Sequence, residues 1–303
     1  MRIVMVGASG FLGRSLRRRL TGYGHELVQL VRRRPANAGQ REWHPERGEL
    51  DPATMVGADA VINLAGAGVE DKRWTDEYRN VLVDSRVGPT HTIATTLAAL
   101  PAGERPAVLL NASAVGFYGD TGDTAVDENS PPGQGFFAEL CQAWEAATGR
   151  AEQAGVRVAK LRTGLILDRG GGLLKPMILP FSLGIGGPLA GGRQWMPLMS
   201  LYDWVSAVAF LLERDDIAGP VNLVGPDPVR NAEFTKALGR ALHRPAIAPI
   251  PRIALRVLLG EFADHALANQ RVLPGVLNRT GFTFAHPDPD SALRAAFKPD
   301  LQA

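Results

Sequence analysis

The pattern of hydrophobic positions at the start of the chain predicts a buried strand followed by an amphipathic helix. Residues 3–6 form a short apolar run of the kind found in strands that are buried on both faces. Apolar side chains then recur at the three- and four-residue steps of one helix face, namely Phe11, Leu12, Leu16 and Leu20. A turn that contains glycines connects the two elements, so the chain opens with a strand, a turn and a helix.

Strands and helices continue to alternate as far as residue 225. Further apolar runs predict strands at 25–34, 58–66, 106–115, 156–167 and 219–225. Helical spacing predicts helices at 75–100, 136–147 and 200–214. Such alternation favours right-handed crossovers, so we expect an α/β protein with a doubly wound parallel sheet covered by helices on both faces.

The glycines after the first strand have a spacing that suits a bound pyrophosphate. Glycines at these places allow a tight turn and a close approach of the backbone to the phosphates, which the amides of the helix N-terminus then face. A turn of purely structural importance is the weaker alternative. The predicted cofactor contacts in this turn are Gly7, Ser9, Gly10, Phe11, Leu12 and Gly13.

The end of the second strand indicates which dinucleotide binds. NAD-binding proteins usually place an acidic residue there, about 20 residues beyond the glycines, to bind the ribose 2′-hydroxyl. Here the strand leads directly into Arg32, Arg33 and Arg34. A guanidinium can hold a 2′-phosphate with paired hydrogen bonds, so we predict NADP as the cofactor, with Arg32 and Arg33 as its contacts. The alternative is that these arginines only coat a loop.

Small residues end the two following strands. Leu64, Ala65 and Gly66 end one strand, and Ala112 and Ser113 end the next. Open α/β sheets bind ligands outside the carboxyl ends of their strands. We therefore predict cofactor contacts at the first four of these residues and a substrate or cofactor contact at Ser113.

These motifs resemble the extended, nucleotide-sugar-epimerase-like branch of the short-chain dehydrogenase/reductase superfamily. The resemblance rests on "GASGFLG", "NLAGAG", "NASAVGFYG" and Asp203 in "LMSLYDWVSAVAFLL". More narrowly, "DSRVGPT", "RTGLILDRGGG" and the tail "PIPRIALRVLLGEFAD" resemble epimerase-family proteins with a distinctive C-terminal region, over nearly the whole chain. The resemblance implies a Rossmann-type domain and a smaller, mostly helical C-terminal substrate lobe.

The predicted domain boundary lies at residue 168, where the amino-acid composition changes. Residues 168–197 are dense in Gly and Pro and predict an irregular segment, while the chain from Asn231 onward is mainly helical. We expect an NADP-binding domain at 1–167, to which residues 200–225 return. The substrate lobe and the distinctive C-terminal region would then occupy residues 168–303.

The resemblance also implies a catalytic Tyr-x-x-x-Lys pair, and this sequence departs from it. Counting back four places from Glu145 puts the lysine at Cys141 and the tyrosine at Phe137. A phenyl ring has no proton to transfer and a thiol cannot replace the charge of an ammonium group. Both residues lie on one apolar helix stripe, so we expect them to be packing residues.

Tyr118 is the best substitute acid, because it follows Ser113 by five residues on the same loop. We predict Ser113 and Tyr118 as the catalytic pair, with a structural role for Tyr118 as the alternative. A phenol near its reference pKa of about 10 needs a nearby positive charge to act as a base at neutral pH. The oxidised nicotinamide ring, Lys72, Arg73 or Arg162 would have to supply that charge.

Three further residues are candidate substrate contacts. Arg162 follows the last large strand, and Arg193 and Trp195 lie in the Gly/Pro-rich segment, where a basic and aromatic pair would suit a phosphate and a ring. Packing of a lid explains the last two equally well. The resemblance further implies a possible homodimer through the helices at 76–99 and 136–153.

Composition and net charge exclude several classes of protein and kinds of site. The chain has 303 residues with 45% apolar residues, which allows a large core, and its net charge of +2 does not support a nucleic-acid or membrane-surface protein. The single cysteine excludes an internal disulfide, and the scattered histidines do not have zinc-site spacing, so no metal is expected. No membrane span and no signal peptide are expected, and a cytoplasmic protein is the default.

Three functions from different classes remain open at this point. The first is an NADP-dependent oxidoreductase or epimerase that acts on a small molecule with an atypical acid. The second is a nucleotide-binding regulator that senses NADPH without turnover. The third is a partner-binding descendant of the fold that no longer binds a cofactor, and the glycine turn with Arg32 and Arg33 weighs against it.

Overall fold

The computed structural model describes residues 1–297, apart from the side chains of residues 258, 259, 264 and 266. The chain divides into two compact units. Unit 1 comprises residues 1–113, 139–161 and 208–220, and unit 2 comprises residues 114–138, 162–207 and 221–303. Because the chain crosses from one unit to the other several times, neither unit is one continuous stretch of sequence.

A seven-stranded sheet forms the framework of unit 1. Its strand order is β12-β7-β5-β4-β1-β2-β3, and the pairs from β5 to β3 run parallel. The order confirms the predicted Rossmann-type α/β fold. The strands are β1 Arg2–Val6, β2 Glu26–Val31, β3 Gln40–Glu42, β4 Ala60–Asn63, β5 Val108–Ala114, β7 Arg157–Thr163 and β12 Gly219–Leu223.

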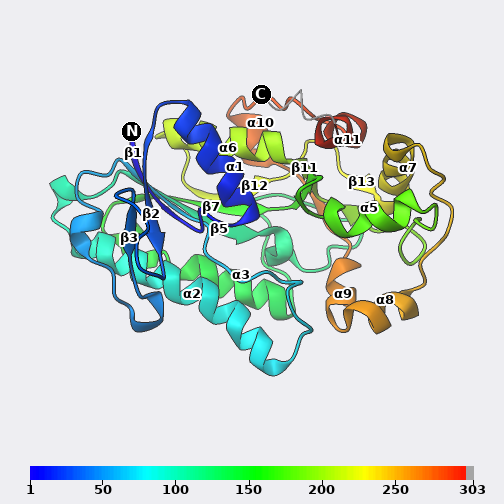
Figure 1. Ribbon diagram of the computed structural model, residues 1–303, viewed down its shortest axis with the longest axis horizontal. Helices are drawn as coiled ribbons and strands as arrows, with labels where there is room; N and C mark the ends of the chain where they lie inside the picture. Colours follow the sequence, from blue (N-terminus) through cyan, green and yellow to red (C-terminus); the bar gives the residue numbers. More distant parts are fainter. Residues whose placement is uncertain (298–303) are drawn as a thin grey trace. The chain divides into compact units, whose positions relative to one another are not determined.

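Helices cover both faces of this sheet, with α1 on one face and α2 on the other (Figure 1). The helices of this part of the chain are α1 Phe11–Gly22, α2 Asp76–Ala99, α3 Phe136–Ala146 and α4 Gly149–Gln153. Short 3₁₀ helices lie at η1 Pro45–Arg47, η2 Pro52–Thr54, η3 Ala102–Glu104 and η4 Val115–Tyr118. The core between the helices and the sheet is mainly aliphatic and includes Val4, Val28, Val61, Ile93, Leu97, Leu109 and Val158, together with Trp43 and Met55.

The start of α2 shows why the predicted helix at 75–100 forms. The side chain of Thr75 accepts a hydrogen bond from the backbone N–H of Tyr78, and two acidic residues occupy the first turn. Both features stabilise a helix N-terminus. The helix continues through Pro89 and ends at Ala99, as the sequence pattern predicts.

The described part of unit 2 contains three small sheets and several helices. The sheets have the orders β11-β8-β9, β10-β13 and β14-β6. Their strands are β6 Ala125–Val126, β8 Leu165–Asp168, β9 Gly171–Gly172, β10 Trp195–Met196, β11 Leu198–Ser200, β13 Val229–Arg230 and β14 Arg271–Val272. The helices are α5 Leu174–Ser182, α7 Asn231–Leu242, α8 Arg252–Leu259, α9 Phe262–Ala266, α10 Gly275–Arg279 and α11 Pro289–Phe297. Helix α6 Leu201–Glu213 begins in unit 2, and its residues from 208 onward belong to unit 1. Their shared core includes Leu167, Phe181, Phe234, Leu238 and Leu293.

Two predicted elements are wrong in detail. The strand predicted at 156–167 is broken at Gly164, so that β7 and β8 join different sheets. A Cβ at Gly164 would lie 2.3 Å from the carbonyl oxygen of Pro197, and only glycine allows this close approach. The segment 168–197, predicted to be irregular, contains α5, which continues through Pro180.

The apolar stripe of α3 is only partly buried. Leu140, Cys141 and Trp144 are buried, whereas Phe136 and Phe137 are half-buried. The ring of Phe137 instead stacks on the imidazole of His265 in α9, with ring centroids 3.7 Å apart. The phenyl ring at the expected tyrosine position therefore packs against the C-terminal region.

Candidate functional site

Two glycines of the turn in unit 1, Gly7 and Gly13, have no space for a side chain. Gly7 has φ +76°, and a Cβ there would lie 2.4 Å from the carbonyl oxygen of Leu64. A Cβ at Gly13 would lie 2.1 Å from the carbonyl oxygen of Gly7. Gly10 is the N-cap of α1 and offers no side-chain acceptor to the first-turn amides. This combination of a tight turn and an uncapped helix start is suited to a pyrophosphate.

The carboxyl ends of four neighbouring strands meet at the same edge of the sheet. The register pairs Val6 with Leu30 on one side and with Asn63 on the other, and Asn63 with Asn111. The turn after β1, the arginines after β2 and the residues that follow β4 and β5 therefore share one edge. Among the predicted contacts here, Ser9, Gly10 and Gly66 are exposed, and Leu64, Ala65 and Ala112 are half-buried.

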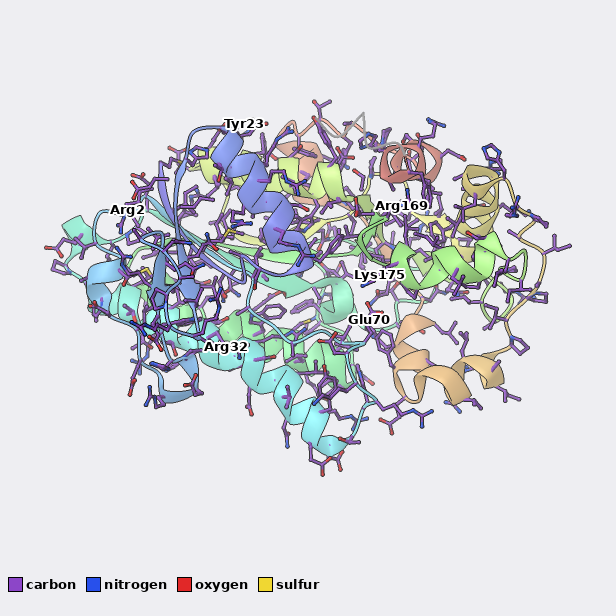
Figure 2. All side chains as sticks on the ribbon, viewed as in Figure 1. Arg2, Tyr23, Arg32, Glu70, Arg169 and Lys175 are labelled. Carbon is purple, nitrogen blue, oxygen red and sulfur yellow. The ribbon has the colours of Figure 1, made fainter. Side chains whose placement is uncertain are left out.

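The three arginines that favour NADP follow β2 directly. Arg32, Arg33 and Arg34 are all exposed. Figure 2 labels Arg32 beyond the end of β2. Since β2 pairs with β1, these side chains lie beside the glycine turn, where a 2′-phosphate would need cations.

A buried polar network supports the ends of β4 and β5. The side-chain amide of Asn63 donates to Asn111 Oδ1 at 2.7 Å and to Thr90 Oγ1 at 2.9 Å. The indole N–H of Trp144 donates to the same threonine oxygen at 3.0 Å. These bonds tie the sheet edge to α2 and α3, and they satisfy groups that would be expensive to bury alone.

Ser113 is oriented by a residue that the sequence reasoning did not assign to the site. Its hydroxyl donates to Glu145 Oε1 at 2.7 Å, and both side chains are buried. A serine has one proton, so this bond leaves only acceptor lone pairs for another group. The spacing of Glu145 from Cys141 was visible in the sequence, but its pairing with Ser113 was not.

Tyr118 lies in unit 2 within a second buried network. Its hydroxyl donates to Asn222 Oδ1 at 2.8 Å and accepts from Arg162 Nη1 at 2.9 Å. Desolvation by burial raises the pKa of Tyr118 to about 12, against the opposing effect of the Arg162 charge. The predicted cation is therefore present, but burial outweighs its effect on the phenol.

The network extends to a buried carboxylate. Glu128 Oε1 accepts from the backbone N–H of Asn222 at 3.0 Å and from that of Val276 at 3.1 Å. The guanidinium of Arg162 also lies 3.4 Å from the ring centroid of Phe117. Arg162 is 4% exposed, so it contacts a tyrosine and a phenyl ring inside unit 2. The other two candidate cations, Lys72 and Arg73, are exposed residues of unit 1.

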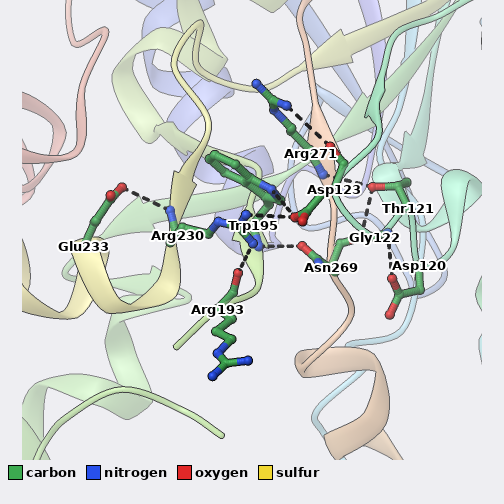
Figure 3. Close-up of polar contacts among 10 residues, drawn as sticks. All are labelled: Asp120, Thr121, Gly122, Asp123, Arg193, Trp195, Arg230, Glu233, Asn269 and Arg271. Carbon is green, nitrogen blue, oxygen red and sulfur yellow. Dashed lines mark hydrogen bonds and ion pairs between the residues drawn. The ribbon is translucent and has the colours of Figure 1, made fainter. Parts of the chain in front are cut away.

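Trp195 belongs to an exposed cluster of charges in unit 2 (Figure 3). Its indole N–H donates to Asp123 Oδ1 at 3.1 Å, and Arg230 binds the same oxygen at 2.8 Å. The guanidinium carbons of Arg230 and Arg271 lie 4.1 Å and 4.8 Å from the indole centroid. These contacts occupy much of the ring that was predicted to stack on a substrate. Arg193 is exposed beside them, and its carbonyl oxygen accepts from Arg230.

Two further structural observations concern metal sites and membrane spans. Among the described side chains, histidine, cysteine and acidic residues do not gather in groups of three or more that would suit a metal ion. None of the described helices is both long enough and apolar enough to cross a membrane.

Comparisons with known proteins agree with this geometry. Residues 3–224 match the NAD dependent epimerase/dehydratase family, and residues 250–296 match a domain of unknown function, DUF1731. The epimerase family protein Mb2239 of Mycobacterium bovis is 45% identical over 94% of this chain and 93% of its own length.

Two similar solved structures cover nearly the whole chain. The human epimerase family protein SDR39U1, solved with NADPH, has a TM-score of 0.89 and 31% identity, and the alignment covers 98% of this chain and 99% of that one. A nucleoside-diphosphate sugar epimerase from Corynebacterium glutamicum has a TM-score of 0.80 and 34% identity over 98% of this chain and 57% of that one. With its glycine turn, sheet order and C-terminal region, this chain belongs to the NAD dependent epimerase/dehydratase family.

Proposed function

We propose that this protein binds NADPH at the carboxyl edge of the unit 1 sheet and uses it as an oxidoreductase or epimerase without the usual Tyr-x-x-x-Lys pair. The observation that carries the proposal is the row of exposed arginines after β2, on the strand next to a glycine turn in which Gly7 and Gly13 leave no space for a Cβ. Guanidinium groups favour the 2′-phosphate that distinguishes NADPH from NADH. The human relative solved with NADPH supports the same choice.

The experiment is a fluorescence titration with NADPH and NADH. We expect tighter binding of NADPH, and we expect Arg32→Ala with Arg33→Ala to weaken it by about 1.5–3 kcal/mol, roughly tenfold or more. Arg17→Ala with Arg18→Ala is the matched control, because both residues are exposed on α1. Equal affinity for the two nucleotides, with no loss in the Arg32/Arg33 variant, would contradict the proposal.

An NADPH sensor without turnover is the second candidate. The observation that favours it is the enclosed hydroxyl of Tyr118, whose pKa of about 12 makes proton transfer at neutral pH unfavourable. A substrate screen with the wild type and Tyr118→Phe separates the candidates. Turnover that depends on Tyr118 supports the enzyme with the predicted Ser113/Tyr118 pair. Tight NADPH binding without any turnover supports the sensor.

A separate proposal concerns the C-terminal part of the chain. We assign residues 168–303 to a substrate lobe, with Arg162, Arg193 and Trp195 as its candidate contacts. The surroundings of Arg162 and Trp195 suggest support of the lobe rather than direct contact, because both already bind neighbouring side chains. A homodimer and a cytoplasmic location also stay predictions, which size-exclusion chromatography and cell fractionation can check.

A further inference from the structure

Two stretches of unit 2 contain no acidic residue. Residues 169–202 and 234–260 carry neither Asp nor Glu, although the whole chain has 31 such residues. The net charge of +2, which by itself does not support a membrane-surface protein, therefore averages over an uneven distribution. The exposed basic residues of these two stretches include Lys175, Lys236, Arg240, Arg244, Arg252 and Arg256.

The most exposed large apolar side chains belong to the same two stretches. Among the described residues, those of unit 2 are Leu179, Leu183, Ile185, Ile247, Ile253 and Val257. Ile247 and Ile253 are each 78% exposed, whereas the exposed apolar residues of unit 1, such as Val56 and Val81, are less so. Apolar surface in water costs free energy, so several such side chains together mark a surface that binds something.

The two stretches lie side by side in unit 2. The backbone N–H of Ala248 donates to the carbonyl oxygen of Gly186 at 3.3 Å, and Arg244 Nε donates to that of Ser182 at 3.0 Å. These bonds hold the end of α5 against the connection between α7 and α8. We call the surface formed by residues 174–190 and 243–257 the α5/α8 face.

Basic and apolar side chains are neighbours on both helices of the α5/α8 face. On α8, the exposed Ile253 and Val257 are one turn apart, and each directly follows an exposed arginine. On α5, the exposed Lys175 and Leu179 are also one turn apart. Long basic side chains in this arrangement can reach lipid phosphates while the apolar side chains enter the acyl region.

A cavity of about 740 Å³ adjoins this face at the end of α7. Its larger lining residues are Lys236, Arg240, His243, Arg244 and Ile247. Arg240 forms an ion pair with Asp290 at 2.8 Å, whereas the bonds of Arg244 go to the neutral carbonyl groups of Ser182 and His243. The cavity therefore combines cations with an apolar wall, which suits the phosphate of a lipid headgroup.

We propose that the α5/α8 face docks on the surface of a membrane that contains anionic lipids. A membrane surface offers negative charge and an apolar interior together, and both are complementary to this face. A second copy of the chain fits less well, because a symmetric contact would place the basic residues of the face against one another. Docking of this kind needs no helix that crosses the membrane.

The test is co-sedimentation of the full chain with phosphatidylcholine vesicles, prepared with and without phosphatidylglycerol. We expect binding to the anionic vesicles alone, and we expect high salt to weaken it because salt screens surface charge. Ile253→Ser with Val257→Ser should weaken binding roughly tenfold or more through lost apolar burial. Lys175→Gln with Lys236→Gln should have an effect of similar size through lost charge.

The matched controls lie in unit 1. Val56→Ser with Val81→Ser and Arg17→Gln with Arg18→Gln change exposed residues of the same types and should leave vesicle binding unchanged. Thermal unfolding checks that every variant folds. Equal binding to neutral vesicles, no binding to anionic ones, or equal losses in variants and controls would overturn the proposal.

Sedimentation velocity without vesicles tests the alternative of a contact between copies. We expect Ile253→Ser with Val257→Ser to leave the oligomeric state of the protein unchanged. A dimer that dissociates in this variant would show that the α5/α8 face binds a second copy, and the proposal would then be wrong.

Discussion

The carboxyl edge of the unit 1 sheet and the Tyr118 network of unit 2 both contain buried polar groups, but they satisfy these groups differently. At the sheet edge, the backbone amides at the start of α1 have no side-chain cap. Around Tyr118, the hydroxyl donates to Asn222 and accepts from Arg162. Donors without a partner in the protein can bind a ligand, whereas donors that are already paired contribute to the stability of the fold.

The largest effect is expected from a substitution at Gly13, in the glycine turn. Gly13→Val places side-chain atoms against the carbonyl oxygen of Gly7, where a Cβ alone would be 2.1 Å away. We expect a loss of about 3 kcal/mol in the free energy of unfolding, at the upper end for overpacking, together with loss of NADPH binding. Gly22→Val is the control, because a Cβ there meets nothing within 4 Å. Denaturant unfolding and nucleotide titration measure both effects, and a stable Gly13→Val that binds NADPH would refute the close approach.

Tyr118→Phe should have a different profile, in which stability falls but nucleotide affinity does not. The substitution removes the partner of Asn222 Oδ1 and of Arg162 Nη1, and buried groups left unsatisfied cost about 1–3 kcal/mol. Thermal unfolding and NADPH titration check this, with Tyr23→Phe as the exposed control. A tenfold loss of NADPH affinity without loss of stability would place Tyr118 with the nucleotide site instead.

His265 should make the stability of unit 2 depend on pH, with a smaller effect than that of Tyr118→Phe. Desolvation lowers its pKa from 6.5 to about 4, so the unfolded state binds more protons between these values. Stability is then greatest above pH 6.5 and falls as the pH drops toward 4. For a partly exposed ring we expect roughly 1–2 kcal/mol. His265→Phe keeps a ring against Phe137 and should remove this part of the acid sensitivity, and unchanged acid sensitivity in the variant would contradict the assignment.

The smallest effect is expected at Asp123, in the exposed cluster around Trp195. Hydrogen bonds from Trp195 and then Arg230 lower the pKa of this carboxyl group. Because the side chain is 75% exposed, Asp123→Asn should leave the melting temperature unchanged within error. A clear loss of stability would show that this cluster is as important to unit 2 as the Tyr118 network.

Local features of the fold were predictable, because their causes lie close together in the sequence. The strand, glycine turn and helix at 2–22 need only the apolar pattern and three glycines, and α2 matches its predicted range. The break at Gly164 was not predictable, since it depends on the carbonyl group of Pro197. Helix α5 was hidden by Pro176 and Pro180, which suggest a loop in the sequence.

In the candidate site, too, features with local causes were predictable and features that depend on distant residues were not. The arginines after β2 could be found because the turn and the strand end are both visible in the sequence. The bond from Arg86 to Ala67 joins residues 19 positions apart, and the bond from Tyr118 to Asn222 spans 104 positions. An arginine in the middle of a helix looks solvent-facing unless the loop beside it is known. Pairings that depend on tertiary packing therefore escaped the sequence analysis.

The uncapped start of α1 links the stability of this protein to its surroundings. Helix ends whose amides have no acceptor are stabilised when an anion arrives, and a ligand that binds only the native state raises stability by mass action. With the proposed NADPH binding, a nucleotide concentration about 100 times the Kd would add about 2.7 kcal/mol. The fraction of folded protein in a cell would then follow the supply of reduced nucleotide, and protein abundance would report metabolic state without any change in synthesis.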